Sequence, residues 1–174
     1  MSREGKYSGV GKIRHLLRCI TEEKLRVAKH SNPLTQLPGN VPLYEWIDHL
    51  LLARENMVVA YVDINHFKPF NDAFGYSFGD EIILCLSNIL RRILDAERDF
   101  IGHVGGDDFI VIFRSENWRE RCEQVFVEFN AAYLDLLPQA QMEYWSNDRN
   151  GSRQRFGALT LAIGCVFPDF TSCT

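Results

Sequence analysis

The chain has 174 residues, of which 46% are hydrophobic and 24% charged, the balance of a folded domain and not of a disordered or fibrous chain. Twenty-three acidic against nineteen basic side chains give a formal net charge of -4, which disfavours binding to a nucleic acid polymer through its phosphates. Nucleotide substrates remain compatible with this charge, because a metal ion can supply positive charge locally.

The sequence favours a cytoplasmic protein without membrane insertion. No apolar run approaches the ~18 residues needed to cross a bilayer, and the first residues lack the apolar core of a secretion signal. The five cysteines are odd in number and form no CxxC pair. Cys85, Cys122 and Cys165 lie among apolar residues and are interpreted as reduced packing thiols, with a disulfide or metal role as the alternative.

The first predicted element is a helix from about residue 10 to 29. Its apolar residues recur near helical spacing and form a narrow stripe: Ile13, Leu16, Leu17, Ile20 and Val27. A helix with so little apolar surface packs either on a partner chain or an upstream domain, or on its own domain. The following segment, 31–40, contains two prolines and a glycine and predicts an ordered turn.

A second helix is expected over about 41–54, and the apolar run Met57 to Val62 predicts a strand buried on both faces. This strand ends at Asp63. The polar and aromatic segment 65–80 predicts short helical turns and loops. Asp80 then opens a helix to about residue 95, with acidic side chains at its positive end.

Two apolar runs, 100–104 and 109–113, are joined through Gly105 and Gly106 and predict a tight hairpin whose tip displays Asp107 and Asp108. A helix over about 117–137, a polar loop or small hairpin over 138–157 and a last strand over 159–167 complete the chain. This order lacks the regular alternation of a doubly wound sheet. It predicts an α/β sandwich with a mixed, largely antiparallel sheet flanked by helices.

Asp63 and Asp107 are the informative pair, because they converge at one edge of the sheet if their strands are neighbours. Two carboxylates and a free backbone carbonyl suit Mg²⁺ and an enzyme of phosphoryl or nucleotidyl transfer. Lys68 can neutralise a phosphate, and backbone N–H groups around His66 and Phe67 can cradle another. On spacing alone, Asp63 as a helix cap and Asp107 as a turn residue remain an open alternative.

Asn71 and Asp80 offer an amide and a carboxylate, which match the N1–H and 2-amino edge of guanine. Two other patterns carry no chemistry. The segment Gly9–Lys12 lacks the first glycine, the Ser/Thr and the preceding strand of a phosphate-binding loop. The five histidines show no metal-ligand spacing, so zinc is not expected.

Four ordered segments resemble the GGDEF domain of bacterial diguanylate cyclases over about residues 30–168. These are NPLTQLPGN (32–40), DINHFKPFNDAFGYSFGDE (63–81), GHVGGDDF (102–109) and LTLAIGCV (159–166). The resemblance implies a palm-like, ferredoxin-like fold of the nucleotidyl cyclases. It also implies condensation of two GTP into cyclic di-GMP and two pyrophosphates by a homodimer that uses Mg²⁺ or Mn²⁺.

The resemblance also implies a role for each matching position. Asp63, the Ile64 carbonyl and Asp107 would hold the metal, and Asp107, Asp108 and Lys68 would be catalytic. The substrate-binding set would be His66, Phe67, Lys68, Asn71, Asp80, Gly105 and Gly106. Residues 1–30 would form a linker or signalling helix, and residues 31–174 the GGDEF domain, without the helix that usually follows and supplies further triphosphate contacts.

The chain departs from the family pattern at other positions. Asp108 stands where Glu is usual, one methylene shorter, and His103 stands where Arg is usual. Alanine at 96 replaces the arginine of an RxxD product-inhibition site that ends at Asp99, so feedback through that site is not expected.

The wording of the motifs is most similar to GGDEF domains in chains that also carry EAL and CBS domains. Two rival hypotheses therefore stand beside the cyclase. One is a GTP-binding module that regulates a linked EAL phosphodiesterase, and the other is a purely structural dimerisation domain.

Overall fold

The computed structural model describes residues 2–3, 6–7, 13–136, 143–148 and 150–168. Its helices are α1 (Ile13–His30), α2 (Asn40–Leu52), α3 (Phe67–Phe74), α4 (Tyr76–Ile93) and α5 (Trp118–Leu136). Its strands are β1 (Ser2–Arg3), β2 (Lys6–Tyr7), β3 (Val58–Asn65), β4 (Phe100–Gly105), β5 (Asp108–Phe113), β6 (Tyr144–Asn147), β7 (Arg153–Phe156) and β8 (Thr160–Val166).

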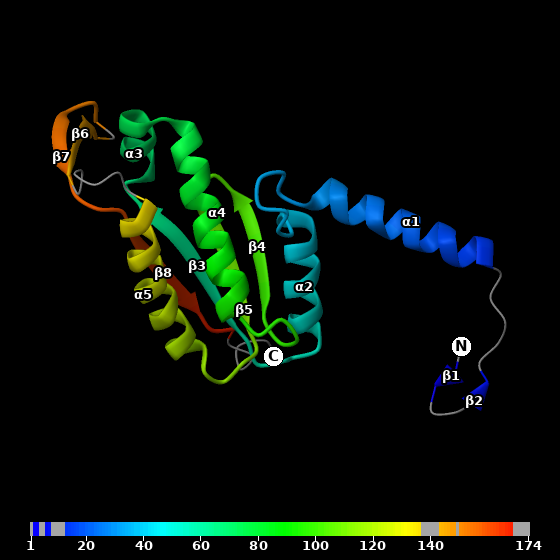
Figure 1. The fold of residues 1–174 in the computed structure, drawn as a ribbon. Helices are drawn as coiled ribbons and strands as arrows, with labels where there is room; N and C mark the ends of the chain where they lie inside the picture. Colours follow the sequence, from blue (N-terminus) through cyan, green and yellow to red (C-terminus); the bar gives the residue numbers. More distant parts are fainter. Residues whose placement is uncertain (1, 4–5, 8–12, 137–142, 149, 169–174) are drawn as a thin grey trace.

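The central sheet has the strand order β4-β5-β3-β8, and every neighbouring pair is antiparallel. With helices between β3 and β4 and between β5 and β8, this is the βαββαβ arrangement of ferredoxin-like folds. The predicted fold class is therefore confirmed, although the four described strands of this sheet are wholly antiparallel and not mixed. Helices α4 and α5 lie over one face of the sheet, and α2 lies beside β4 on the other side (Figure 1).

Successive side chains of β3 point to opposite faces of the sheet, and each face packs against its own apolar cluster. Val62 and Ile64 point to the side of α4 and α5 and join the larger apolar cluster. Val59, on the opposite face, packs against the smaller apolar cluster, to which α2 contributes Leu43 and Leu50. Tyr61, on that same face, is 45% exposed and belongs to neither cluster. The prediction that this strand is buried on both faces is therefore wrong at Tyr61, in the second half of the strand.

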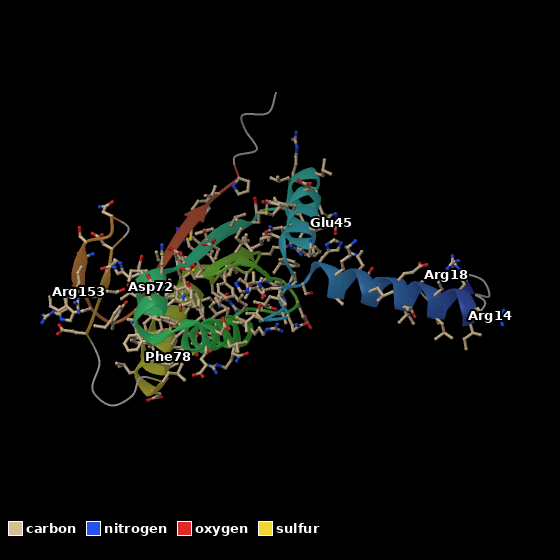
Figure 2. The ribbon with its side chains drawn as sticks, turned by 90° about the horizontal axis from the view of Figure 1, so that it is seen from above. Arg14, Arg18, Glu45, Asp72, Phe78 and Arg153 are labelled. Atoms are coloured by element: carbon tan, nitrogen blue, oxygen red, sulfur yellow. The ribbon has the colours of Figure 1, made fainter. Side chains whose placement is uncertain are left out.

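Helix α1 projects away from the rest of the domain (Figure 1). Arg14 and Arg18 lie far from the sheet, whereas Glu45 of α2 lies near the inner end of α1 (Figure 2). An ion pair between Arg26 and Glu45, 2.9 Å apart, joins the two helices. The apolar side chains of Ile13 and Leu17 remain 73% and 56% exposed, so α1 does not pack on its own domain as one alternative held.

Element boundaries differ from the predictions in two informative places. Helix α4 begins at Tyr76, so Asp80 lies inside the helix and not at its start. The preceding helix ends at Gly75, whose φ of 88° separates α3 from α4. The polar segment after α5 contains the two-stranded β6–β7 sheet, which confirms the small hairpin among the two alternatives. Residues 10–12 and 137 of the predicted helices, the Gly9–Lys12 segment and Cys173 lie outside the described residues.

The thiols of Cys85, Cys122 and Cys165 are free and partly buried against the larger cluster, as predicted. Burial raises the pKa of the Cys122 thiol to about 12, which keeps it protonated. Across the described part of the chain, no helix has both the length and the apolar character to span a membrane.

Candidate functional site

Three carboxylates meet where β3 and β5 run side by side. The antiparallel register pairs Val62 with Phe109, so the next residues, Asp63 and Asp108, are neighbours on the open face of the sheet. Asp107 precedes β5 in the turn that follows β4. Carboxylate oxygens of Asp63, Asp107 and Asp108 all lie within 4.8 Å of one another.

The strand that carries Asp63 is longer than the sequence predicts. It continues to Asn65, and Asp63 pairs there with Ala162 of β8 instead of standing at the strand end. The predicted alternative of a helix cap is therefore wrong for Asp63, because helix α3 begins four residues later, at Phe67. The condition set for convergence, that the two strands are neighbours, is met.

The β4–β5 turn depends on its two glycines. Gly105 has a φ of 153° and Gly106 a φ of 58°, and the space where a Cβ would stand is open at both residues. The backbone of the turn is thus accessible on that side, as a closely approaching ligand would require.

The acidic cluster carries an electrostatic cost. Burial, together with the neighbouring carboxylates of Asp63 and Asp108, raises the pKa of Asp107 to about 6. None of the ion pairs among the described residues involves these three acids. Tyr61 donates a hydrogen bond to the cluster, because its hydroxyl binds Asp108. A divalent cation is the kind of ligand that relieves such crowding.

A cavity of about 590 Å³ opens beside the carboxylates. One wall is the segment from Ile64 to Pro69, in which His66 adopts a φ of 63° immediately before α3. The exposed Lys68 also lines this cavity, so the residues expected to contact phosphates share it with the acids. The β6–β7 hairpin contributes a second part of the lining, with Asp148, Asn150, Gln154 and Phe156.

Sequence reasoning missed this second part of the lining. The hairpin is seated by stacking of Tyr144 on Phe156, whose ring centroids are 5.6 Å apart, and by Tyr144 against Phe70 and Phe74 of α3. The sequence of β6, Tyr-Trp-Ser-Asn, does not alternate apolar and polar residues, although the strand alternates buried and exposed positions, so period-2 reasoning had no clear signal to find.

The two residues expected to recognise guanine do not line this cavity. Asn71 of α3 is buried with 9% of its surface exposed, and its Oδ1 has no hydrogen-bond partner among the described residues. A Cβ at Gly79 of α4 would stand 1.9 Å from this Oδ1. The absence of a side chain at Gly79 therefore leaves the space that the Asn71 amide occupies. Asp80 follows directly and is exposed.

His103 has a structural function that its sequence position did not reveal. Its ring is buried, stacks on Phe109 and joins two segments of the chain. The Nε2 atom lies 2.9 Å from the carbonyl oxygen of Gly106 and Nδ1 lies 2.9 Å from the hydroxyl of Thr35. Because a carbonyl only accepts, Nε2–H donates to Gly106 and the Thr35 hydroxyl donates to Nδ1. Burial lowers the pKa of His103, consistent with this neutral form.

The fold and the site together define a palm-like α/β domain in which an acidic cluster lines a cavity of about 590 Å³. The family model of the "Diguanylate cyclase, GGDEF domain" matches residues 29–138. The chain therefore belongs to the GGDEF family.

Curated relatives agree with this assignment. The cyclic di-GMP phosphodiesterase PdeR of Escherichia coli is 32% identical over 117 residues, which cover 61% of this chain and 18% of that protein. The diguanylate cyclase DgcZ of E. coli is 33% identical over 100 residues, covering 56% of this chain and 33% of that protein. The chain thus spans a third or less of these two relatives.

Solved structures share the fold. The coiled coil and GGDEF domain of DgcB from Caulobacter crescentus, in complex with c-di-GMP, aligns with a TM-score of 0.65 at 21% identity. This alignment covers 90% of the present chain and 78% of that one.

The raised pKa of Asp107 gives a prediction for Asp107→Asn in metal-free buffer. The fold disfavours the charged carboxylate, so the variant is expected to be more stable than the wild type at pH 8, by about 1 kcal/mol after solvent screening. This advantage should shrink as the pH falls through 6 toward 4, because the wild-type carboxyl then takes up a proton in the folded state.

Urea unfolding with EDTA at a series of pH values measures this difference. Asp72→Asn, an exposed substitution on α3, is the matched control and should show no such pH dependence. Equal stability of Asp107→Asn and the wild type across pH 4–8 would contradict the account of the cluster.

Proposed function

We propose that this chain is a diguanylate cyclase domain that condenses two GTP molecules into cyclic di-GMP and two pyrophosphates. The observation that carries the proposal is the convergence of Asp63, Asp107 and Asp108 within 4.8 Å beside a cavity, on the fold of this family. Each transfer joins the 3′-oxygen of one GTP to the α-phosphorus of the other, breaks the bond to the β-phosphate and releases pyrophosphate and a proton. Because each GTP attacks the other, catalysis requires two protomers.

The donor set fits a magnesium or manganese ion. All three side chains offer carboxylate oxygens, and among the described residues no cysteine or histidine belongs to the cluster. This donor set favours a hard cation over zinc. Asp63, Asp107 and the Ile64 carbonyl would hold it. When bound, such an ion offsets the negative charge of the phosphates and stabilises charge that develops on the attacked group.

The remaining side chains supply binding and orientation. Lys68 would pair with a phosphate, and the backbone N–H groups of His66 and Phe67, at the start of α3, would bind another. The open backbone of Gly105 and Gly106 would let the nucleotide approach the turn closely. Asp107, at that turn, would lie near the attacking 3′-hydroxyl.

Recognition of guanine is proposed for Asn71 and Asp80. The buried Oδ1 of Asn71 lacks a partner in the described part of the chain, and a base edge with N–H groups would supply one. Asp80 would accept from the same edge of the base.

Product inhibition through an RxxD site is not proposed. In addition to the alanine at 96, the Asp99 side chain is fully buried and occupied within the fold. Its oxygens accept from the backbone N–H groups of Asp95, Arg114 and Ser115 and from the Ser115 hydroxyl.

A second candidate function is a GTP-binding module that regulates a linked EAL phosphodiesterase. The substitutions at Asp108 and His103 favour it, and one relative is named as a phosphodiesterase. In either case residues 1–30 would form a linker to EAL, CBS or other sensory domains in a cytoplasmic protein, an arrangement that the exposed apolar side chains of α1 support.

The direct test incubates the full-length protein with GTP and Mg²⁺ or Mn²⁺ and resolves the nucleotides by chromatography. The wild type is expected to form cyclic di-GMP, and Asp63→Ala to lose at least a hundredfold in rate without a fall in its unfolding temperature. Tight GTP binding without product, together with GTP-dependent hydrolysis of cyclic di-GMP, would instead establish the regulatory module.

Substitution of Gly79 by alanine tests the guanine site. The new Cβ would meet the Asn71 amide at 1.9 Å and displace it, so the preference for GTP over ATP in binding should fall about tenfold or more. Gly157→Ala is the matched control, because open space surrounds that position. An unchanged GTP preference in Gly79→Ala, measured by calorimetry, would remove Asn71 from base recognition.

A further inference from the structure

The Tyr61 side chain stands on the open face of the sheet, next to the acidic cluster. It lies two residues before Asp63 on β3 and so shares its face, and its hydroxyl donates a hydrogen bond to Oδ1 of Asp108 on β5. In the register Tyr61 pairs with Ile110, which makes Asp108 its diagonal neighbour, within the reach of an aromatic side chain. Its other strand neighbour is Gly164, which has no side chain to cover the ring.

Tyr61 is poorly explained as a packing residue. Almost half of its surface is exposed, and it belongs to neither of the two buried clusters. Tyr61 lines the same cavity as the three acids. In the hydrogen bond between them, the Tyr61 hydroxyl is the donor and the Asp108 carboxylate the acceptor.

The hydrogen bond from Tyr61 constrains the Asp108 side chain, which neighbouring charges would otherwise turn away from the cluster. Its carboxylate is one methylene shorter than the glutamate usual at this position, and it lies beside two other acids that repel it. A carboxylate free to rotate would turn away from them. A donor fixed on β3 that holds Oδ1 restricts this rotation and leaves Oδ2 for another ligand.

We propose that Tyr61 is a positioning residue that orients Asp108 as a third carboxylate ligand of the divalent cation. Tyr61 acts through Asp108 and does not itself bind the ion. This inference rests on the cation site of the proposed function and extends it to a residue outside the acidic motif.

The test measures binding of Mn²⁺ alone to the full chain, by loss of the electron paramagnetic resonance signal of free Mn²⁺. Tyr61→Phe removes only the donor and is expected to raise the Mn²⁺ dissociation constant about tenfold. Tyr44→Phe, at an exposed tyrosine of α2, should leave it unchanged. In turnover assays Tyr61→Phe should raise the metal concentration for half-maximal rate, with kcat at saturating metal within about threefold of the wild type.

A double-mutant cycle decides whether Tyr61 acts through Asp108. Asp108→Ala alone should weaken Mn²⁺ binding, and adding Tyr61→Phe to it should cause no further loss. An equal loss in both backgrounds, or an unchanged dissociation constant in Tyr61→Phe alone, would overturn the positioning role. If the wild type binds no Mn²⁺ at millimolar concentration, the cation site fails, and the inference fails with it.

Discussion

Repulsion among three carboxylates is the constraint on which the site depends. Asp63, Asp107 and Asp108 are brought within 4.8 Å by antiparallel pairing of β3 and β5, and the described residues supply no cationic partner for them. The sheet therefore holds together charges that repel one another, and burial together with these neighbouring acids raises the pKa of Asp107. Groups whose pKa is shifted by burial and by a neighbouring charge cluster at sites of binding and catalysis.

The surrounding fold holds this cluster from two sides. On one side, the buried His103 ties the Gly106 carbonyl to Thr35, so the acidic turn is anchored to the 31–38 segment that links α1 to α2. On the other side, the aromatic contacts of Tyr144 seat the β6–β7 hairpin on α3 and close the cavity. Both supports involve contacts between segments far apart in the chain, and both place rigid groups around a polar centre.

Hydrophobic patterning was sufficient to predict α2, α4, α5, the central strands and the antiparallel fold class, because each of these elements buries a set of apolar residues. Convergence of Asp63 and Asp107 could also be predicted from the strand and the glycine turn. Three features could not be predicted: the role of Tyr61, the space that Gly79 leaves for the Asn71 amide, and the hydrogen bonds of His103. Each depends on side chains that meet across separate elements, which no local pattern in the sequence encodes.

The most direct test of the account is the anomalous scattering of a crystal of this protein soaked with Mn²⁺. The account predicts a single strong peak at about 2.1–2.3 Å from carboxylate oxygens of both Asp63 and Asp107, with Asp108 turned toward it. A peak bound elsewhere, with these two side chains pointing apart, would contradict the central claim that β3 and β5 together build one cation site.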